Sequence, residues 1–214
     1  MTPLLLVLSS PSGGGKTTIA KALLAARDDL AYSVSATTRP PREGERDGVD
    51  YYFLTDQEFR RRRDAGEFVE WTEYSGYLYG TPQSEVDRIL ASGRHVMLDI
   101  EVQGARLIRQ RRSDVVSIFI LPPSVDELLQ RLGGRGQSRP ADMERRVRRA
   151  VEEVDEAQHY DYIVINADRT QAVAEVAAII DAEAHRTPRH ASLRDLIGRF
   201  KRELAQAADS LAKS

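Results

Sequence analysis

The sequence predicts a three-layer α/β protein, in which a central parallel sheet carries helices on both faces. Short apolar segments of strand length alternate along the chain with amphipathic helical segments, which is the pattern of a parallel sheet. A glycine-rich segment joins the first strand to the first helix, and the length of 214 residues suffices for one large core. The predicted strands of this sheet are Leu4–Ser9, Tyr32–Ala36, His95–Ile100, Val115–Leu121 and Asp161–Asn166.

The composition limits the classes of partner and compartment. The 31 basic and 33 acidic residues nearly balance, so the total charge gives no reason to expect nucleic-acid or membrane binding. The chain contains no cysteine, which excludes disulfides and thiolate metal sites and fits a reducing compartment. It shows no leader-like start and no apolar run of the roughly 18 residues that a membrane span needs. We therefore expect a cytoplasmic protein.

The glycine-rich segment predicts a phosphate loop for a nucleoside triphosphate. In such a loop, backbone N–H groups of flexible glycines converge on phosphate oxygens, a lysine reaches the β- and γ-phosphates, and a hydroxyl residue binds Mg²⁺. A helix-prone run follows, so the helix dipole would point at the bound anion. Ser10 stands where the motif has its first glycine. The residues predicted to bind the triphosphate are Ser12, Gly13, Gly14, Gly15, Lys16, Thr17 and Thr18.

The segment from about Arg39 to Ser92 interrupts the alternation and predicts an insertion built differently from the core. Short antiparallel strands are expected here around a helix that begins after Thr55, because Thr55 and Glu58 form a capping box. The predicted strands of the insertion are Tyr51–Leu54, Glu67–Tyr74 and Tyr77–Tyr79.

Three features of the later chain also carry structural expectations. A second capping box at Ser124 predicts the start of a helix. The segment Gly133–Gln137 predicts a hinge between two helices. From about Thr187 onward, apolar residues recur at helical spacing, and we expect this tail to pack on the core rather than on a partner.

Two arginines and two tyrosines predict an anion site in the insertion. Arg39 and Arg42 lie on a proline-stiffened loop, and Tyr51 and Tyr79 follow near glycines. Guanidinium forks and phenol hydroxyls are donors of fixed geometry that suit a phosphate group. The set could hold a nucleoside monophosphate, although surface arginines beside turn tyrosines would give the same pattern.

Taken together, several motifs resemble those of the guanylate kinase family, whose members transfer a phosphoryl group from ATP to GMP. The motifs are SPSGGGKTT, SATTRPPREGE, DYYF, EFVEW, YLYGT, LDIEVQG and IFILPPS, and they share one register from about Leu4 to about Ala184. The resemblance implies a phosphate-loop core at 1–38 and 93–186, a mixed α+β GMP-binding insertion at 39–92, and a helical lid at approximately 131–150. The last 30 or so residues lie outside the resemblance, and their apolar spacing predicts a C-terminal helical extension at 187–214.

For the acceptor, the resemblance implies two groups of binding residues. A carboxylate recognises guanine, because guanine presents N1–H and N2–H₂ donors side by side, whereas adenine would leave that carboxylate unpaired. Without the resemblance, Glu70 would be expected to face solvent from a strand. The residues implied for the GMP phosphate are Arg39, Arg42, Tyr51 and Tyr79, and those for guanine are Glu70, Ser35 and Thr81.

For the donor, the resemblance implies ATP with Mg²⁺. Asp99 ends the apolar run after His95 and would support the metal with Thr17, through metal-bound water. Glu101 stands where the family more often has Asp, so no role is assigned to it. Arg131 and Asn166 are implied as ATP-binding residues, and the residues implied as catalytic are Lys16, Arg39, Arg135 and Arg146.

Other charged side chains are expected to be solvated. Arg60–Arg63 is expected on the exposed face of a short helix. The remaining lid arginines are expected on a solvated helix face with acidic partners, and these residues are Arg145, Arg148, Arg149, Glu144, Glu152 and Glu153.

The expected reaction needs no catalytic base, because the attacking phosphate oxygen of GMP is already ionised near neutral pH. Two alternatives remain open, namely a non-catalytic binding module with the guanylate-kinase-like fold and a kinase for another nucleoside monophosphate. The expected partners are GMP and ATP, without nucleic acid or membrane, and the sequence leaves the oligomeric state open, a homo-oligomer included.

Overall fold

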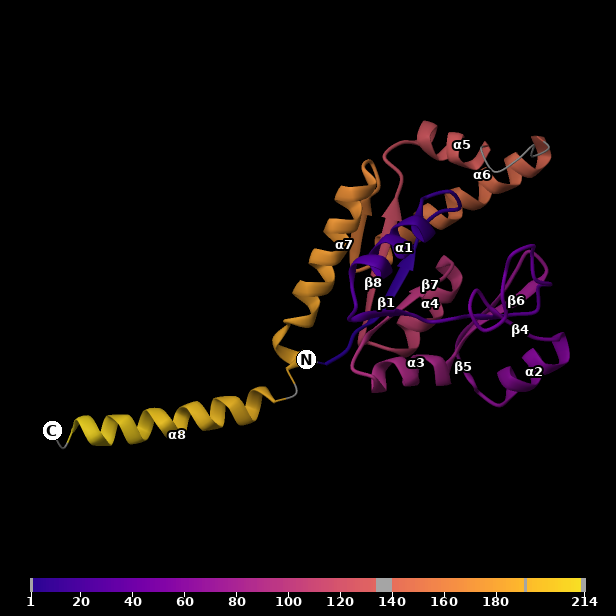
Figure 1. Ribbon diagram of the computed structural model, residues 1–214. Coiled ribbons are helices and arrows are strands. Elements are labelled where there is room, and N and C mark those ends of the chain that lie inside the picture. Colours follow the sequence, from indigo (N-terminus) through magenta and orange to yellow (C-terminus); the bar gives the residue numbers. More distant parts are fainter. Residues whose placement is uncertain (1, 134–139, 191, 213–214) are drawn as a thin grey trace.

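A parallel sheet of five strands forms the centre of the molecule (Figure 1). The computed structural model describes residues 2–133, 140–190 and 192–212, with only the backbone of residues 140–142. All neighbouring strands of the sheet are parallel, in the order β2-β7-β1-β8-β9. This arrangement confirms the predicted fold class. The strands are β1 (Leu5–Ser9), β2 (Leu30–Tyr32), β7 (His95–Asp99), β8 (Val115–Leu121) and β9 (Tyr162–Ile165).

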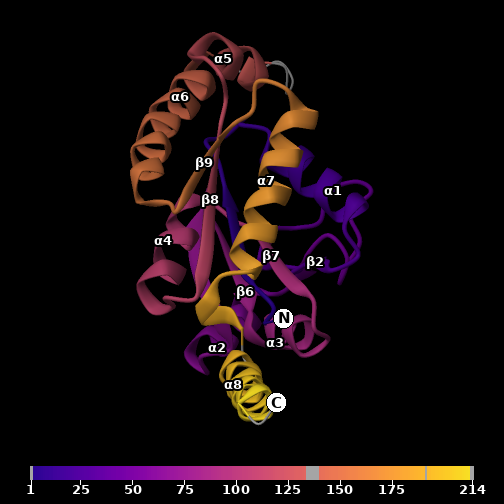
Figure 2. The same ribbon diagram turned by 90° about the vertical axis from the view of Figure 1, so that its left-hand side faces the viewer.

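Helices cover both faces of this sheet (Figure 2). α1 (Lys16–Ala26) and α7 (Arg169–Ala184) pack on one face, and α3 (Gln83–Ala91) and α4 (Val102–Arg111) pack on the other. Successive side chains of a strand point to opposite faces, and every residue of β1 is buried. Burial on two sides explains why the sequence of β1 is a continuous apolar run rather than an alternating one.

A second, mixed sheet forms the insertion. Its strands are β3 (Ala36–Thr37), β4 (Tyr52–Phe53), β5 (Phe68–Tyr74) and β6 (Tyr77–Pro82), in the order β4-β3-β6-β5, and α2 (Asp56–Asp64) packs beside them. Thr55 accepts a hydrogen bond from the backbone N–H of Glu58 at 3.1 Å, so the predicted start of α2 is confirmed. The arginines of α2 pair with neighbouring carboxylates. Arg60 and Arg61 are exposed as expected, whereas Arg62 and Arg63 are half-buried, and the Arg63 guanidinium lies 5.2 Å from the centre of the Trp71 ring.

Two expectations about the strands were wrong. The predicted strand Tyr32–Ala36 is divided, because β2 ends at Tyr32 in the main sheet and β3 begins at Ala36 in the second sheet. Since β2 lies at the edge of the main sheet, the chain can leave there while its apolar alternation continues. β4 was expected to be antiparallel but pairs with β3 in parallel. The long loop between β3 and β4 permits this, because a parallel pair needs a crossover connection.

Two helices follow β8 and extend over the open end of the sheet (Figure 1). They are α5 (Val125–Gly133) and α6 (Pro140–Asp155), and a 3₁₀ turn at Glu156–His159 leads on to β9. Ser124 accepts from the backbone N–H of Glu127 at 3.2 Å, which confirms the predicted start of α5. Gly133 ends α5, and the rest of the predicted hinge lies outside the described residues.

The tail does not pack on the core, contrary to the sequence-based expectation. After a 3₁₀ turn at Thr187–Arg189, α8 (Leu193–Leu211) extends away from the body (Figure 1). None of the described residues of α8 is buried, and Phe200 is 56% exposed. The core cluster that α7 completes ends at Ala184, and just before α8 the Arg189 side chain donates to Asp114 O and to Glu183. Within the described ranges, no helix has both the length and the apolar character to span a bilayer.

Candidate active site

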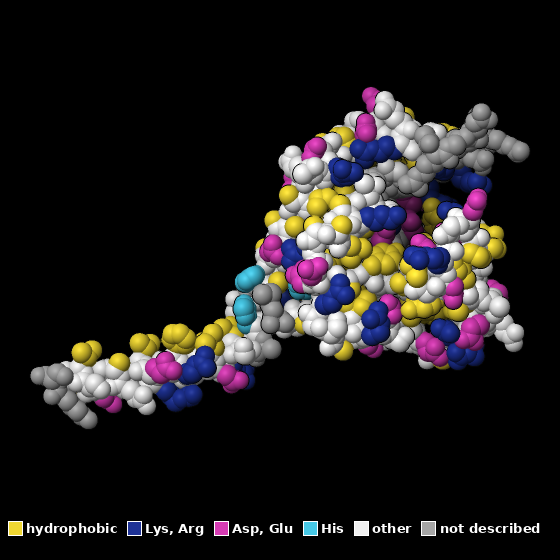
Figure 3. Space-filling model, viewed as in Figure 1, with side chains coloured by type: hydrophobic (Ala, Val, Ile, Leu, Met, Phe, Trp, Pro, Cys, Tyr) yellow, Lys and Arg dark blue, Asp and Glu magenta, His cyan; other side chains and the backbone are white. Residues whose placement is uncertain are grey.

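A cleft of about 720 Å³ lies between the loop after β1, the insertion and α6. Figure 3 shows the hollow on the side of the molecule away from α8, with charged side chains of both signs around it. Most of the predicted site residues line this one cleft. They are Ser12, Gly13, Gly15, Lys16, Thr17, Thr18, Ser35, Arg39, Arg42, Tyr51, Glu70, Tyr79, Asp99 and Arg146.

The loop between β1 and α1 has the backbone that a phosphate loop needs. Gly13 and Gly15 adopt φ values of +88° and +96°, in the left-handed region where a side chain would be strained. The N–H of Gly14 donates to Pro11 O at 2.8 Å and closes a turn before the helix. A Cβ on Gly14 would lie 2.7 Å from that of Ser10, so a glycine at position 14 makes room for the serine that departs from the motif.

Lys16 and Asp99 form an ion pair at the carboxyl edge of the main sheet. The Nζ–Oδ1 distance is 2.7 Å, and Thr17 donates to the other Asp99 oxygen at 3.3 Å. Burial favours the neutral amine, but the negative charges of Glu101 and Asp99 outweigh it and raise the pKa of Lys16 above its ordinary value. Glu101 itself lies 3.8 Å from Lys16 and lines the cleft. A carboxylate beside a hydroxyl provides the hard oxygen donors that Mg²⁺ prefers.

Arg131 and Asn166 lie behind the loop rather than in the cleft. Asn166 Nδ2 donates to Gly14 O at 3.0 Å, and Arg131 donates to the same oxygen at 3.4 Å. Arg131 is also held by Glu127 at 2.9 Å. Both side chains therefore support the loop backbone in this structure.

Of the two lid arginines implied as catalytic, Arg146 lines the cleft and donates to Leu132 O at 2.8 Å, whereas Arg135 lies outside the described residues.

The Arg39 guanidinium is held on several sides within the insertion. The whole residue is 8% exposed. Its guanidinium donates to Pro40 O at 2.7 Å and to Glu45 at 2.8 Å, and lies 5.3 Å from the centre of the Tyr51 ring. The second oxygen of Glu45 accepts from the backbone N–H of Arg42 at 2.7 Å. Arg39 lowers the pKa of Glu45, so this carboxylate stays ionised. The sequence reasoning did not identify Glu45, although its place three residues after Arg42 suits such a turn.

Two tyrosine hydroxyls complete the donor group around Arg39. The rings of Tyr51 and Tyr79 meet edge to face with their centres 6.1 Å apart. Burial raises the pKa of Tyr51, so its hydroxyl stays protonated and can donate a hydrogen bond. The cleft thus has, besides the phosphate loop, a wall of cationic and hydroxyl donors.

Glu70 is buried, unlike the solvent-facing residue expected for its strand alone. It is 3% exposed, and Thr81 donates to its Oε1 at 2.7 Å. The register of β5 and β6 shifts between Phe68 and Glu70, and such a bulge re-aims the side chains that follow it. Burial raises the pKa of Glu70 to about 7. Thr81 does not line the cleft and acts on it through Glu70.

One face of α6 contacts the cleft, and part of this was not expected. The Arg149 guanidinium lies 4.4 Å from the centre of the Tyr74 ring in the insertion. Glu153 is buried and accepts from the backbone N–H of Ser12 at 2.8 Å. The expectation that both are solvated was wrong, because they share the face of Arg146 at spacings of three and four residues. The exposed pair of Arg148 and Glu144 is as expected, at 2.8 Å.

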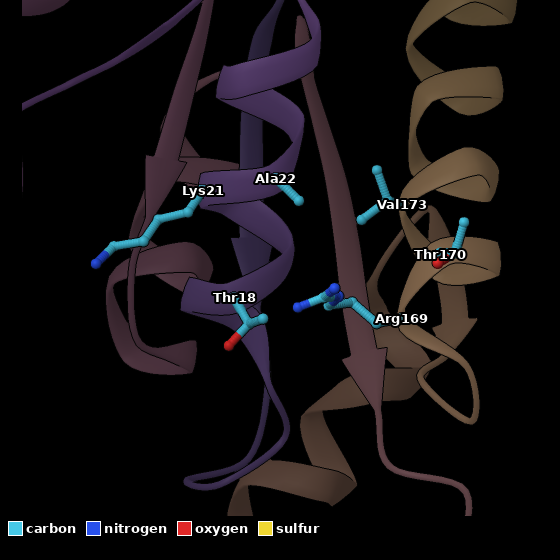
Figure 4. A pocket seen from close by; sticks show the side chains of 6 residues that line it. All are labelled: Thr18, Lys21, Ala22, Arg169, Thr170 and Val173. Atoms are coloured by element: carbon cyan, nitrogen blue, oxygen red, sulfur yellow. The ribbon is translucent and has the colours of Figure 1, made fainter.

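A second depression of about 500 Å³ lies between α1 and α7 (Figure 4). Of the predicted site residues, only Thr18 lines it, and its charged side chains, Lys21 and Arg169, are exposed. In the described part of the chain, no group of three or more carboxylate or histidine side chains could hold a metal ion.

The glycine loop, the charged Lys16 and the Asp99 carboxylate at the end of a parallel sheet define a phosphate-loop nucleotide-binding protein. The family model for guanylate kinase matches residues 2–183. The guanylate kinase of Symbiobacterium thermophilum is 49% identical, with 87% of this chain and 89% of that protein covered. The guanylate kinase of Chelativorans sp. is 47% identical, with 90% of this chain and 89% of that protein covered. A crystal structure of guanylate kinase from Anaplasma phagocytophilum matches with a TM-score of 0.77 and 35% identity, over 93% and 96% of the two chains. The chain belongs to the guanylate kinase family.

Proposed function

We propose that this chain transfers the γ-phosphoryl group of ATP to GMP in the cleft, reversibly, giving ADP and GDP. Family membership supports the activity. The observation that carries the residue roles is that one cleft joins the phosphate loop to the wall of Arg39, Arg42, Tyr51 and Tyr79. Two anionic substrates could therefore lie end to end between two groups of donors. We also propose that the partners of the chain are small nucleotides and that it acts in the cytoplasm.

On the donor side, backbone N–H groups of residues 13–18 bind the phosphates of ATP, and Lys16 supplies a fixed positive charge. The ion pair with Asp99 and the bond to Ile100 O hold the ammonium at the edge of the sheet. Thr17 and Asp99 would hold Mg²⁺, because both present oxygens to the same place. When bound, Mg²⁺ would offset negative charge on the transferring phosphoryl group.

On the acceptor side, Arg39, Arg42, Tyr51 and Tyr79 bind the phosphate of GMP. Arg39 is held by Glu45 and by the Tyr51 ring, so its donors are oriented before a substrate arrives. The side chain of Glu70 accepts from the N1–H and N2–H₂ groups of guanine, with Thr81 fixing one of its oxygens. Ser35 also lines the cleft and would be a further hydroxyl donor.

The barrier is the approach of two polyanions, and the cations of the cleft lower it. Two unit charges about 4 Å apart interact by about 4 kcal/mol at an effective dielectric of about 20. Lys16 and Arg146 offset this repulsion from the donor side and Arg39 from the acceptor side. Closure of α6 and the insertion over both nucleotides would exclude water, which could otherwise accept the phosphoryl group. The role of Arg135 remains a prediction.

A substrate panel tests this function and both alternatives. We expect ATP-dependent phosphorylation of GMP, with kcat/KM for AMP, CMP and UMP at least about 100-fold lower, because Glu70 would be left unpaired. Chelation of Mg²⁺ should abolish the reaction. A coupled assay for ADP measures all four acceptors. Turnover of another monophosphate at an equal rate would identify a different kinase, and no turnover at all would identify a binding module.

Asp99→Asn is expected to raise the Mg²⁺ concentration for half-maximal activity by about tenfold or more. An amide binds a hard cation more weakly than a carboxylate does, because it carries no charge. A titration of activity with Mg²⁺ at fixed ATP measures this shift. Glu101→Gln is the matched control, because Glu101 neighbours Lys16 but forms no bond with Thr17. An unchanged Mg²⁺ requirement in Asp99→Asn would exclude Asp99 from the metal site.

A further inference from the structure

Gly104 lies so close to the Glu70 carboxylate that a residue with a side chain would not fit at position 104. It belongs to the first turn of α4 and lines the cleft. A Cβ built on Gly104 would lie 2.7 Å from Glu70 Oε2 and 3.1 Å from Glu70 Cδ. Both distances are shorter than ordinary contacts of a methyl group. A side chain at position 104 and the present position of the carboxylate therefore exclude each other.

Neither partner can move aside cheaply. Glu70 is 3% exposed, and its Oε1 is held by Thr81, which is completely buried in β6. The helix that carries Gly104 is fixed next to it by Ala105 and Ile108, which are both fully buried in the core against the main sheet. A methyl group on residue 104 would thus displace the carboxylate rather than the helix.

The backbone of Gly104 gives no other reason for a glycine. Its φ is not in the left-handed region, and it lies in regular helix. At such a position alanine is the better helix former by about 1 kcal/mol. Space for the carboxylate is therefore the structural use of this glycine.

We propose that Gly104 is a specificity-determining residue, which sets the orientation of the guanine-binding carboxylate. This inference rests on the proposed function, in which Glu70 accepts from two adjacent N–H groups of guanine. Thr81 fixes one carboxylate oxygen, and the bare backbone of Gly104 defines the position of the other. Both bonds to guanine form only when the plane of the carboxylate matches the plane of the base. A methyl group at position 104 rotates or shifts the carboxylate and removes that match.

Gly104→Ala is the test, with kinetics for GMP and IMP. IMP lacks the 2-amino group, so it reports how much the second guanine bond contributes. We expect KM for GMP to rise about 10- to 100-fold, the preference for GMP over IMP to fall about tenfold, and KM for ATP to stay within about twofold. The melting temperature should fall only slightly, because the better helix propensity of alanine, about 1 kcal/mol, offsets much of the cost of displacing the carboxylate. Gly198→Ala in α8 is the matched control, since its Cβ meets only the Arg202 side chain at 3.6 Å.

A double-mutant cycle separates this role from general damage. In a Glu70→Gln background, guanine recognition is already lost, so adding Gly104→Ala should lower kcat/KM for GMP by less than about twofold. The proposal would be overturned if Gly104→Ala lowered kcat/KM for GMP by the same factor in the Glu70→Gln background as in the parent protein. Unchanged GMP kinetics in Gly104→Ala, or a large, parallel loss of ATP affinity and of melting temperature, would also overturn it. Absence of GMP phosphorylation in the unsubstituted protein would instead refute the proposed function itself.

Discussion

Replacing Lys16 with alanine is expected to lower kcat by about a thousandfold while the fold remains intact. The substitution removes one positive charge from the place where negative charge accumulates during transfer. A loss of about 4 kcal/mol of electrostatic stabilisation corresponds to about three orders of magnitude in rate. Steady-state kinetics at saturating ATP and GMP measure the effect, and circular dichroism checks the fold.

The control for this experiment is Lys201→Ala, which removes the same side chain from the exposed helix α8. Lys16→Ala should also lower the melting temperature, because Asp99 loses the cation that pairs with it at 2.7 Å. The lower melting temperature does not explain the loss of kcat, because kcat is measured at a temperature where the variant is fully folded. A kcat within tenfold of the parent value would contradict the proposed role of Lys16.

Glu70→Gln is expected to lower kcat/KM for GMP by about 100- to 1,000-fold, with KM for ATP unchanged. The amide is nearly the same size as the carboxylate, but it presents N–H donors and no charge to the two donors of guanine. The loss of two hydrogen bonds to a charged group accounts for a decrease of this size. Kinetics with each nucleotide varied in turn measure the split. An equal loss for ATP would show that Glu70 acts on the whole cleft and not on the base.

The pH dependence of the parent protein gives an independent check of Glu70. Burial raises the pKa of this carboxyl group to about 7 from an unfolded value of about 4.5. Below pH 7 the group is protonated and cannot accept both guanine bonds, so KM for GMP should rise up to about tenfold per unit of falling pH. Glu70→Gln should lack this component. A flat profile between pH 6 and 8 in the parent would contradict the role of an ionised Glu70.

The raised pKa of Glu70 also predicts that the ligand-free protein becomes more stable as the pH falls, whereas its binding of GMP becomes weaker. The folded pKa of Glu70 is raised, so its ionisation costs no stability below pH 4.5, and this cost grows to about 3 kcal/mol above pH 7. The ligand-free Glu70→Gln variant should thus be more stable than the parent at pH 8 and equal to it near pH 4.5. Urea unfolding at the two pH values measures this difference.

The central fold could be predicted from the sequence because its signals are local. Strands buried on both faces give continuous apolar runs, and the boxes at Thr55 and Ser124 define helix starts through bonds within four residues. The expectations that failed depend on distant partners. Nothing in Tyr32–Ala36 shows that the chain changes sheets between its ends, and the apolar stripe of α8 has the same spacing as one that packs on a core.

The candidate site shows the same limit. Glycines, lysine and threonine in one loop carry a recognisable pattern, but the burial of Glu70 depends on a register shift against β6. Arg149 and Glu153 look like solvated helix residues until α6 is placed against the cleft. Gly104 carried one signal in the sequence, because a glycine in a helix often marks a close approach of another group. Which group approaches could be learned only from the fold.

The contact between Arg149 and Tyr74 has a thermodynamic consequence for the coupling between the two substrates. It joins α6 to the insertion across the cleft, so the elements that face donor and acceptor are in touch in the free protein. If binding of one nucleotide stabilises this contact, the affinity of the protein for the other nucleotide increases. Linkage requires the factor to be the same in both directions, so ATP would increase the affinity for GMP by as much as GMP increases that for ATP.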